Sequence, residues 1–223
     1  MIVVHHLNNS RSQRILWLLE ELGLEYEIKR YQRDPKTMLA PPELKAVHPL
    51  GKSPVITDGD VVVAESGAII EYLVERAGAR LVPAAGTPAR LRYRHFLHYA
   101  EGSMMPPLLL KLVFDKVESG PLPFFVKPIA RGIAQKVKGS FVLPQIALHL
   151  GYLEAELGKH PWFAGEEFTA ADIALSFPLE AAAARGGLND KYPRLVDFLQ
   201  RIHARPAYVR ALARGGEYQI GKA

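Results

Sequence analysis

The stretch that decides the fold is IVVHHLNNSRSQRILWLLEELGLEYEIKRY, residues 2–31. Residues 2–7 are mostly apolar and β-branched and are followed by two asparagines, which predicts a buried strand. Apolar side chains between 15 and 22 then recur at the spacing of one helix face, and Gly23 marks the end of that helix. Residues 25–31 alternate as in a half-buried strand. The stretch therefore predicts a strand, a helix and a second strand.

Downstream of this stretch, strand and helix signals alternate again. Residues 34–49 contain several prolines and predict at most one short helix. Residues 53–65 (SPVITDGDVVVAE) predict a hairpin, because Asp58 and Gly59 supply a tight turn between two apolar runs. Residues 66–78 (SGAIIEYLVERAG) have helical spacing and end at a glycine. The first part of the chain is therefore expected to have the order βαβ, a connecting region, then ββα.

A segment rich in small residues and proline, residues 79–89, has no hydrophobic period and indicates a linker. Beyond it no β-branched alternating run occurs, so the rest of the chain is predicted to be helical. Thr169 and Asp172 form the pattern of a capping box at the start of a helix, which is a structural feature. We therefore predict an α/β domain over residues 1–80 and an all-helical domain over residues 88–223.

Composition excludes several classes of function. The 223 residues are 48% apolar and carry 28 Lys and Arg against 23 Asp and Glu, a formal net charge of +5. The basic residues are spread along the chain without a nucleic-acid-binding motif, so we expect no nucleic acid, and a small anionic ligand accounts for the excess. No signal peptide opens the chain and no apolar run approaches the roughly 18 residues of a spanning helix, so we expect a cytoplasmic protein.

The absence of cysteine restricts the chemistry further. Without a thiol the chain forms no disulfide, no thiolate metal site and no cysteine nucleophile. His5 and His6 are expected on opposite faces of a strand, and His95 and His98 lack an obvious third ligand. The sequence therefore predicts no metal site.

Four segments carry a family resemblance. They are NNSRSQRILWLLEELGLEYE (8–27), HPLGKSPVI (48–56), ESGAIIEYL (65–73) and FTAADIAL (168–175). In order and spacing they resemble the cytosolic glutathione S-transferases, in particular the serine-type bacterial and fungal members. The resemblance implies a thioredoxin-like N-terminal domain of order βαβαββα, an all-helical C-terminal domain, a homodimer, and glutathione as substrate.

The resemblance also implies residues that bind glutathione. Pro54 resembles the family's cis-proline, which leaves the backbone of Val55 free to pair with an extended peptide. Ser66 heads a predicted helix, where exposed amides and the helix dipole favour a carboxylate, and Glu65 can take the ligand's ammonium group. The alternatives are structural: a trans proline at a strand entry and a helix cap at Ser66.

Two further residues precede the proline. Lys52 resembles the lysine that meets the glycine carboxylate of glutathione. His48 stands where many relatives carry asparagine and is a second candidate for glutathione binding. For both residues the alternative is a simple surface position.

The polar junction before the first helix is where a thiol would be activated. A thiol with a pKa of about 8.5 is only slightly ionised at neutral pH, and lowering that pKa by about two units needs roughly 2.7 kcal/mol of thiolate stabilisation. Relatives place tyrosine, serine or cysteine there, and of these this chain has serine. Ser10 stands about four residues before Arg14, as the reactive serine of similar enzymes does, while Ser12 is expected to cap the helix. Asn9 and Arg11 are the alternatives to Ser10, and the remaining alternative is a purely structural polar turn.

The second substrate is expected to be a small apolar electrophile. Residues 104–143 combine apolar side chains with Lys and Arg, and Met105, Phe114 and Phe124 are the predicted lining of its pocket. Such a lining suits an apolar substrate, including one with a negative charge. The alternative is that this segment only packs helices together.

The predicted activity is conjugation of glutathione to an electrophile, and reduction of organic hydroperoxides is a further reaction that bound glutathione supports. Two other classes of function stay open. One is a non-catalytic glutathione-fold protein that acts as a binding or interaction module and retains glutathione without turnover. The other is a membrane-surface protein that uses residues 104–143, against which the polar interruption in DKVESGPLPFF argues.

Overall fold

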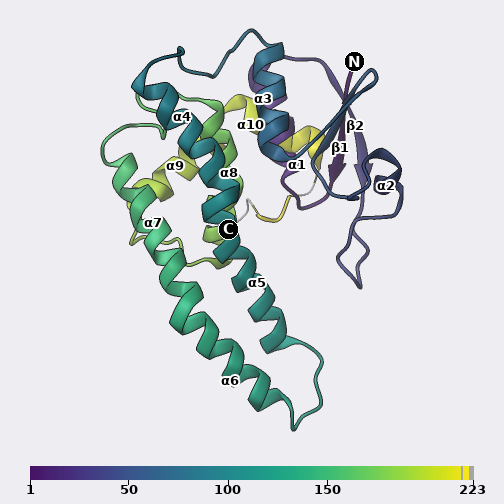
Figure 1. Cartoon of the computed structure of the whole chain (residues 1–223), viewed down its shortest axis with the longest axis vertical. Helices are drawn as coiled ribbons and strands as arrows, with labels where there is room; N and C mark the ends of the chain where they lie inside the picture. The colour runs from purple at the N-terminus through teal and green to yellow at the C-terminus, as the bar shows by residue number, and fades with distance from the viewer. Residues whose placement is uncertain (217, 221–223) are drawn as a thin grey trace.

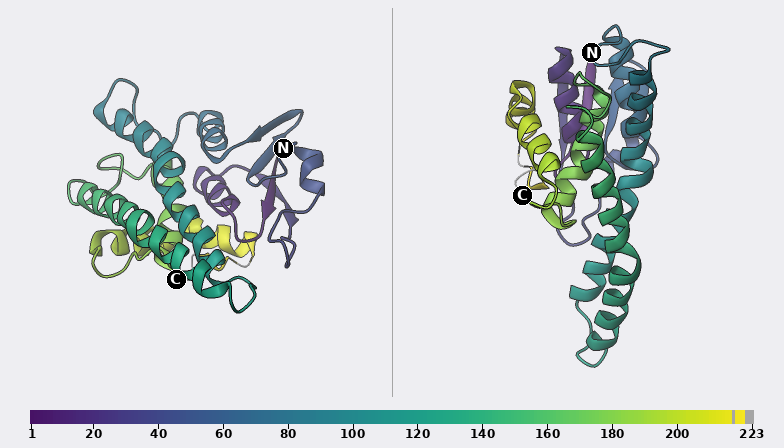
Figure 2. Two further views of the ribbon diagram at one scale, coloured as in Figure 1. Left: turned by 60° about the horizontal axis from the view of Figure 1, so that its bottom comes forward. Right: turned by 90° about the vertical axis from the view of Figure 1, so that its left-hand side faces the viewer.

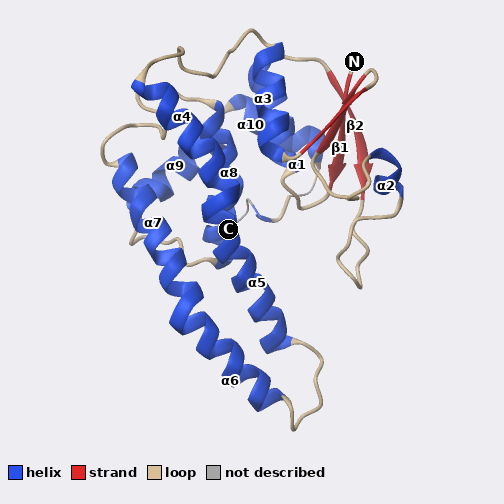
Figure 3. Ribbon diagram, viewed as in Figure 1, coloured by secondary structure: helices blue, strands red, loops and turns tan. Residues whose placement is uncertain are grey.

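The computed structural model describes residues 1–216 and 218–220. Its first part contains one four-stranded sheet of order β2-β1-β3-β4, and its second part is helical (Figure 1, Figure 3). The strands are β1 (Ile2–Leu7), β2 (Tyr26–Tyr31), β3 (Val55–Asp58) and β4 (Val61–Ala64), and the helices of this part are α1 (Ser12–Leu22), α2 (Glu43–Val47) and α3 (Ser66–Arg76). The predicted thioredoxin-like order βαβαββα is confirmed.

The sheet contains both parallel and antiparallel pairs of strands. α1 carries the chain back to the end of the sheet where β1 began, so β2 runs parallel to β1, with Ile2 opposite Tyr26. β3 runs antiparallel to β1, and a tight turn joins it to the antiparallel β4. Gly59 supplies that turn with a φ of 58°, a conformation that glycine adopts without a Cβ penalty.

Helix α1 is buried on more sides than its sequence predicts. The expected face toward the sheet is present, but Leu16 and Trp17 on other faces are also 0% exposed. The reason is tertiary: α1 lies between the sheet and the helical part and packs against α3, α8 and α10. The ring of Trp17 meets Tyr208 of α10 edge to face at 5.2 Å between centroids.

The helical part is built around two long antiparallel rods. In each rod a π-helical turn joins two helices. The first rod comprises α4 (Pro88–Tyr99), the turn Ala100–Met104 and α5 (Met105–Ser119), and the second comprises α6 (Lys127–Val137), the turn Lys138–Val142 and α7 (Leu143–Leu157). Helices α5 and α6 lie side by side and form an arm that projects away from the sheet (Figure 1, Figure 2).

Three more helices complete the fold, namely α8 (Ala170–Arg185), α9 (Pro193–His203) and α10 (Pro206–Gly215). The capping box predicted at the start of α8 is confirmed. Asp172 accepts hydrogen bonds from the amides of Thr169 (2.8 Å) and Phe163 (3.0 Å) and is fully buried, and burial raises its pKa to about 6. None of the described helices has the length and apolarity to cross a bilayer.

Residues 77–87 join the two parts and contain neither helix nor strand. Their backbone nevertheless packs against the helical part, since the amide of Ala170 donates to the carbonyl of Leu81 at 2.9 Å. The division into domains at residues 1–80 and 88–223 stays a prediction.

Candidate functional site

A cavity of about 480 Å³ opens where β1 ends, beside the start of β3 and α3. Every residue that the sequence assigns to glutathione binding lines it, namely His48, Lys52, Pro54, Val55, Glu65 and Ser66. The cavity wall also contains Arg11, Arg33 and Glu101, which come from three distant segments of the chain. We call this space the first cavity.

The entry to β3 has the geometry expected for Pro54, because the peptide bond between Ser53 and Pro54 is cis. The structure corrects the expectation that the backbone of Val55 is free. Val55 is paired with His5 of β1 on one side and with Ala64 of β4 on the other. Ser53, which lies outside every strand and lines the first cavity, is the neighbouring residue with backbone available to a peptide.

The start of α3 presents Glu65 and Ser66 to the first cavity. Glu65 has a φ of 72°, a left-handed conformation that is uncommon for a residue with a Cβ, and its carbonyl accepts the first helical hydrogen bond from Ile69 at 2.9 Å. Ser66 follows as the first residue of the helix and is 4% exposed. A carboxylate at this position would meet the amides and the positive end of the α3 dipole.

At the polar junction before α1, Ser10 and not Ser12 accepts the capping hydrogen bond. Ser12 is the first residue of α1, and its amide donates to Ser10 Oγ at 3.2 Å, so the expectation that Ser12 caps the helix is wrong. Ser10 is 4% exposed and its Oγ lies 2.7 Å from Ser12 Oγ and 3.5 Å from Ser53 Oγ. The Ser10 hydroxyl therefore lies behind Ser53, one side chain away from the first cavity.

The two adjacent histidines of β1 lie on opposite sides of the sheet. His5 Nδ1 is 2.9 Å from the Tyr31 hydroxyl, and His6 Nδ1 is 2.8 Å from Ser12 Oγ. Burial and the nearby positive charge of Arg30 lower the pKa of His6 to about 4. Within residues 1–216 and 218–220, no group of three or more His, Asp and Glu side chains is placed to hold a metal ion.

Arg11 supplies the charge at the junction. Its Nε lies 3.1 Å from Glu101 Oε2, and the same carboxylate pairs with the buried Arg14. Arg14 also donates to the carbonyl of Ala174 at 2.5 Å, which fixes Glu101 against α8. One carboxylate thus faces two guanidinium groups, and the site keeps a net positive charge.

Asn9 and Arg33 hold the rest of the junction together. Asn9 has a φ of 49°, and its Oδ1 accepts from the amide of Gln219 at 2.7 Å. Arg33 donates to the main-chain oxygens of Met38 (3.0 Å) and Asn8 (3.3 Å). Sequence patterns missed Arg33 and Glu101, although the single acidic residue in the otherwise uncharged stretch YAEGSMM was a signal for Glu101.

A second cavity of about 510 Å³ lies next to the first, between α5, α8 and the C-terminal segment. Arg11, Arg33, Met38 and Leu109 line both cavities, so these residues mark their junction. Of the predicted electrophile residues, the structure brings Met105 to this cavity. Phe114 packs against the core instead, and Phe124 is 85% exposed in the segment between α5 and α6.

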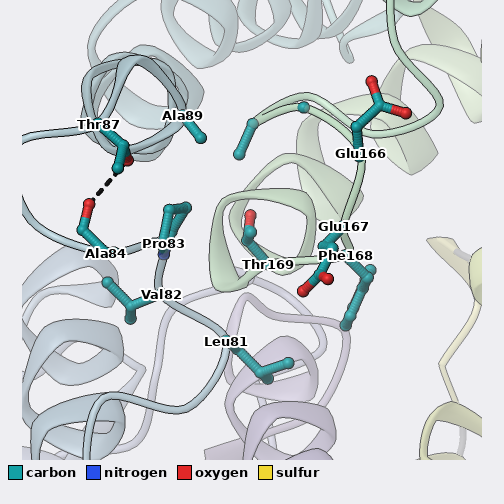
Figure 4. Close-up of a pocket in the computed structure, with 12 residues that line it drawn as sticks. Leu81, Val82, Pro83, Ala84, Thr87, Ala89, Glu166, Glu167, Phe168 and Thr169 are labelled. Atoms are coloured by element: carbon teal, nitrogen blue, oxygen red, sulfur yellow. Dashed lines mark hydrogen bonds between the residues drawn. The ribbon is translucent and has the colours of Figure 1, made fainter.

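A third cavity of about 430 Å³ lies elsewhere, between residues 81–89 and residues 164–169 (Figure 4). Thr87 Oγ1 donates across its rim to the carbonyl of Ala84 at 2.7 Å. None of its described lining residues belongs to the first or second cavity.

Comparison with known proteins places the chain in a family. The family description "Glutathione S-transferase, N-terminal domain" matches residues 1–75, and "Glutathione S-transferase, C-terminal domain" matches residues 122–206. Glutathione S-transferase 3 of Schizosaccharomyces pombe is 39% identical over 209 residues, which are 93% of this chain and 85% of that protein. Glutathione S-transferase 1 of Saccharomyces cerevisiae is 33% identical over 217 residues, covering 93% and 92% of the two chains.

A solved structure agrees with these matches. A glutathione S-transferase from Actinobacillus pleuropneumoniae superimposes with a TM-score of 0.83 at 39% identity, covering 100% of this chain and 97% of the other. The match spans both the sheet and the helical part, as do the sequence relatives. The chain therefore belongs to the glutathione S-transferase family.

Proposed function

We propose that this protein binds glutathione in the first cavity, holds its thiol as a thiolate at the junction of the two cavities, and transfers it to an electrophile in the second. One observation carries the proposal: a cavity lined by Lys52, Glu65 and Ser66 adjoins a second, more apolar cavity, and Arg11 lines both. Such an arrangement supports a two-substrate reaction at the shared wall.

Glutathione fits the first cavity in one orientation. The α-carboxylate of its γ-glutamyl group meets the N-terminus of α3 at Ser66, and its ammonium group meets Glu65. The glycine carboxylate meets Lys52, with His48 beside it. The cysteinyl backbone pairs with Ser53 at the entry to β3. The sulfur then points toward Arg11.

Arg11 and Ser10 are the proposed stabilisers of the thiolate. A guanidinium group within reach favours the ionised thiol and lowers its pKa, as an opposite charge does for any acid. Ser10 contributes through its hydroxyl, which is close to Ser53, while Asn9 positions the loop. Arg11 lines both cavities, whereas Ser10 lines neither, which supports Arg11 as the larger contributor to thiolate stabilisation.

The thiolate can carry out two reactions. In conjugation the sulfur forms a bond to carbon while the leaving group departs with the electron pair, and the thiol proton goes to solvent. In hydroperoxide reduction the sulfur attacks the terminal oxygen, and the O–O bond breaks to release an alkoxide, which takes a proton from solvent and leaves as the alcohol. A second glutathione then reduces the resulting sulfenic acid to give glutathione disulfide and water.

A turnover screen tests the proposal. The protein is assayed with glutathione against aryl halides, organic hydroperoxides, isothiocyanates and disulfides. Turnover of an aryl halide or an isothiocyanate, reduced in Arg11→Gln, supports a transferase, and turnover of hydroperoxides supports the second reaction. Retention on immobilised glutathione with no turnover in any class would support the non-catalytic binding module instead.

Assembly and location are part of the same proposal. Large exposed apolar side chains lie along the arm and α7, including Val113, Ile129, Ile133, Phe141 and Leu148, and support a homodimer that covers some of them. We further propose that the dimer is cytoplasmic and acts on diffusible electrophiles. Sedimentation at micromolar concentration measures the oligomeric state, and fractionation of cells measures the location.

A further inference from the structure

The second cavity carries more positive charge than a purely apolar substrate needs. Four cationic side chains line it, from the junction, the end of β2, α5 and α8: Arg11, Arg33, Lys116 and Arg185. Among the described residues that line it, none is an aspartate or a glutamate. A cavity with several cations and no lining acid favours an anion.

These cations are not fully neutralised by their neighbours. Within the described residues, the one acidic side chain that pairs with Arg11 is Glu101, which also pairs with Arg14. Arg33 donates to main-chain oxygens, and in the described part of the chain no acidic side chain forms an ion pair with Lys116 or Arg185.

The acids closest in sequence to Lys116 are already paired. On α5, Asp115 pairs with Lys111 and Lys138 at 2.6 and 2.7 Å, and Glu118 pairs with Lys138. These contacts direct both carboxylates toward Lys138, the first residue of the turn after α6. The charge of Lys116 therefore stays available to a ligand.

Arg185 also has few partners within the protein. Its buried Nε has no hydrogen-bond partner in the described part of the chain. No protein acceptor therefore holds the guanidinium group through this nitrogen, and the part of Arg185 that lines the cavity is what a ligand would meet.

Apart from Asn9 and Gln219, the remaining lining is apolar. Met38, Met105, Leu112, Phe177 and Ile220 surround the cationic groups. Apolar walls strengthen the attraction between a cation and a bound anion because they exclude water. The ligand that fits both features has an apolar body and one anionic group.

The position of each cation orients this ligand. Arg11 and Arg33 line both cavities and therefore lie where the glutathione sulfur would react, whereas Lys116 and Arg185 line only the second cavity. We propose that the preferred electrophile is an amphipathic anion whose carboxylate binds Lys116 and Arg185, with its reactive carbon at the junction beside Arg11. This inference rests on the proposed function and names the substrate class of its second site.

The experiment compares two electrophiles that differ in one group. An activated aryl halide with a ring carboxylate and its carboxamide are assayed with glutathione, and each rate is divided by the uncatalysed rate. The carboxylate is expected to have a KM about tenfold lower, the effect of one charge-assisted hydrogen bond. In the double variant Lys116→Gln with Arg185→Gln, the KM for the carboxylate should rise about tenfold more than the KM for the amide.

A matched control separates local contacts from general charge. Lys127→Gln with Lys136→Gln removes the same charge from exposed positions of α6 outside both cavities. The inference is wrong if this control raises the KM for the carboxylate as much as the double variant does. It is also wrong if the parent protein has the same KM for the carboxylate and the amide.

A binding measurement keeps the inference testable without turnover. The fluorescence of bound anilinonaphthalene sulfonate, an apolar anion, should be displaced by decanoate far more readily than by decanol. The Lys116 and Arg185 double variant should lose this difference. Absence of turnover with an intact preference for decanoate would count against the transferase and support the anion site, and equal displacement by both would overturn the site.

Discussion

Arg11 and Glu101 face each other across the wall of the first cavity, with 3.1 Å between Nε and Oε2. Arg11 precedes α1 and Glu101 lies in the π-helical turn between α4 and α5, so the ion pair joins the two parts of the chain. The carboxylate is shared with Arg14, and Arg11 is about one third exposed. Arg11 is thus fixed in position and still retains charge for a ligand.

We expect Arg11→Gln to raise the pKa of bound glutathione by about one unit or more, because an adjacent cation favours the thiolate. Turnover at neutral pH should fall in proportion to the lost thiolate. Ultraviolet absorbance of the bound thiolate across pH measures this. Arg94→Gln, an exposed cation on α4, is the control, and an unchanged titration in Arg11→Gln would remove Arg11 from thiolate stabilisation.

Ser10→Ala tests the residue that the sequence favours. It should lower the free energy of unfolding by about 1 kcal/mol, because the amide of Ser12 loses its acceptor. It should also raise the thiol pKa, by less than Arg11→Gln does. Urea unfolding and thiolate titration measure the two effects. A larger pKa change in Ser10→Ala than in Arg11→Gln would make Ser10 the principal donor.

Glu65→Gln should raise the KM for glutathione about tenfold and leave the KM for the electrophile nearly constant, because it removes only the contact to the ammonium group. The substitution keeps the side-chain shape at a backbone position with a φ of 72°. Glu71→Gln, on an exposed position of α3, is the control. Equal changes in both KM values would place Glu65 in the fold and not in glutathione binding.

His6 makes stability depend on pH. Its pKa is about 4 in the folded protein and 6.5 when unfolded, so between these values the unfolded chain binds more protons. Its contribution is complete above pH 6.5 and is lost as pH falls toward 4. Asp172, with a raised pKa of about 6, acts with the opposite sign. We therefore expect the free energy of unfolding of His6→Gln, measured in urea, to fall less than that of the parent between pH 7 and pH 4.5. Identical pH profiles would contradict the assignment.

Thr169→Ala should destabilise the protein by about 1 kcal/mol through the capping box of α8. The hydroxyl of Thr169 donates to Asp172 at 3.0 Å, far from both substrate cavities in the lining of the third. Thermal melting measures the loss. Normal melting with reduced turnover would show instead that Thr169 acts on the reaction.

Local patterns predicted the elements well because each segment of the first part carries its own period or turn. They underestimated the burial of α1, since the side chains that cover Leu16 and Trp17 come from helices such as α10, almost 200 residues later. No local period encodes a partner at that distance.

The site was predictable where it depends on backbone geometry. The helix start at Ser66 follows from the adjacent residues, and the cis bond at Pro54 is what the family resemblance implies. The directions of the side chains were not predictable. The same loop turns Ser10 inward toward Ser12 and Arg11 outward into the cavities. The π-helical turn that brings Glu101 to Arg11 has no signature in composition.

The packing of α10 against α1 has a consequence for synthesis. Trp17 is made long before Tyr208, which it meets edge to face. Until that helix leaves the ribosome, the outer face of α1 stays open to solvent or to a chaperone. A prematurely terminated chain that lacks α10 would therefore expose an apolar surface, and quality control could distinguish it from the finished protein.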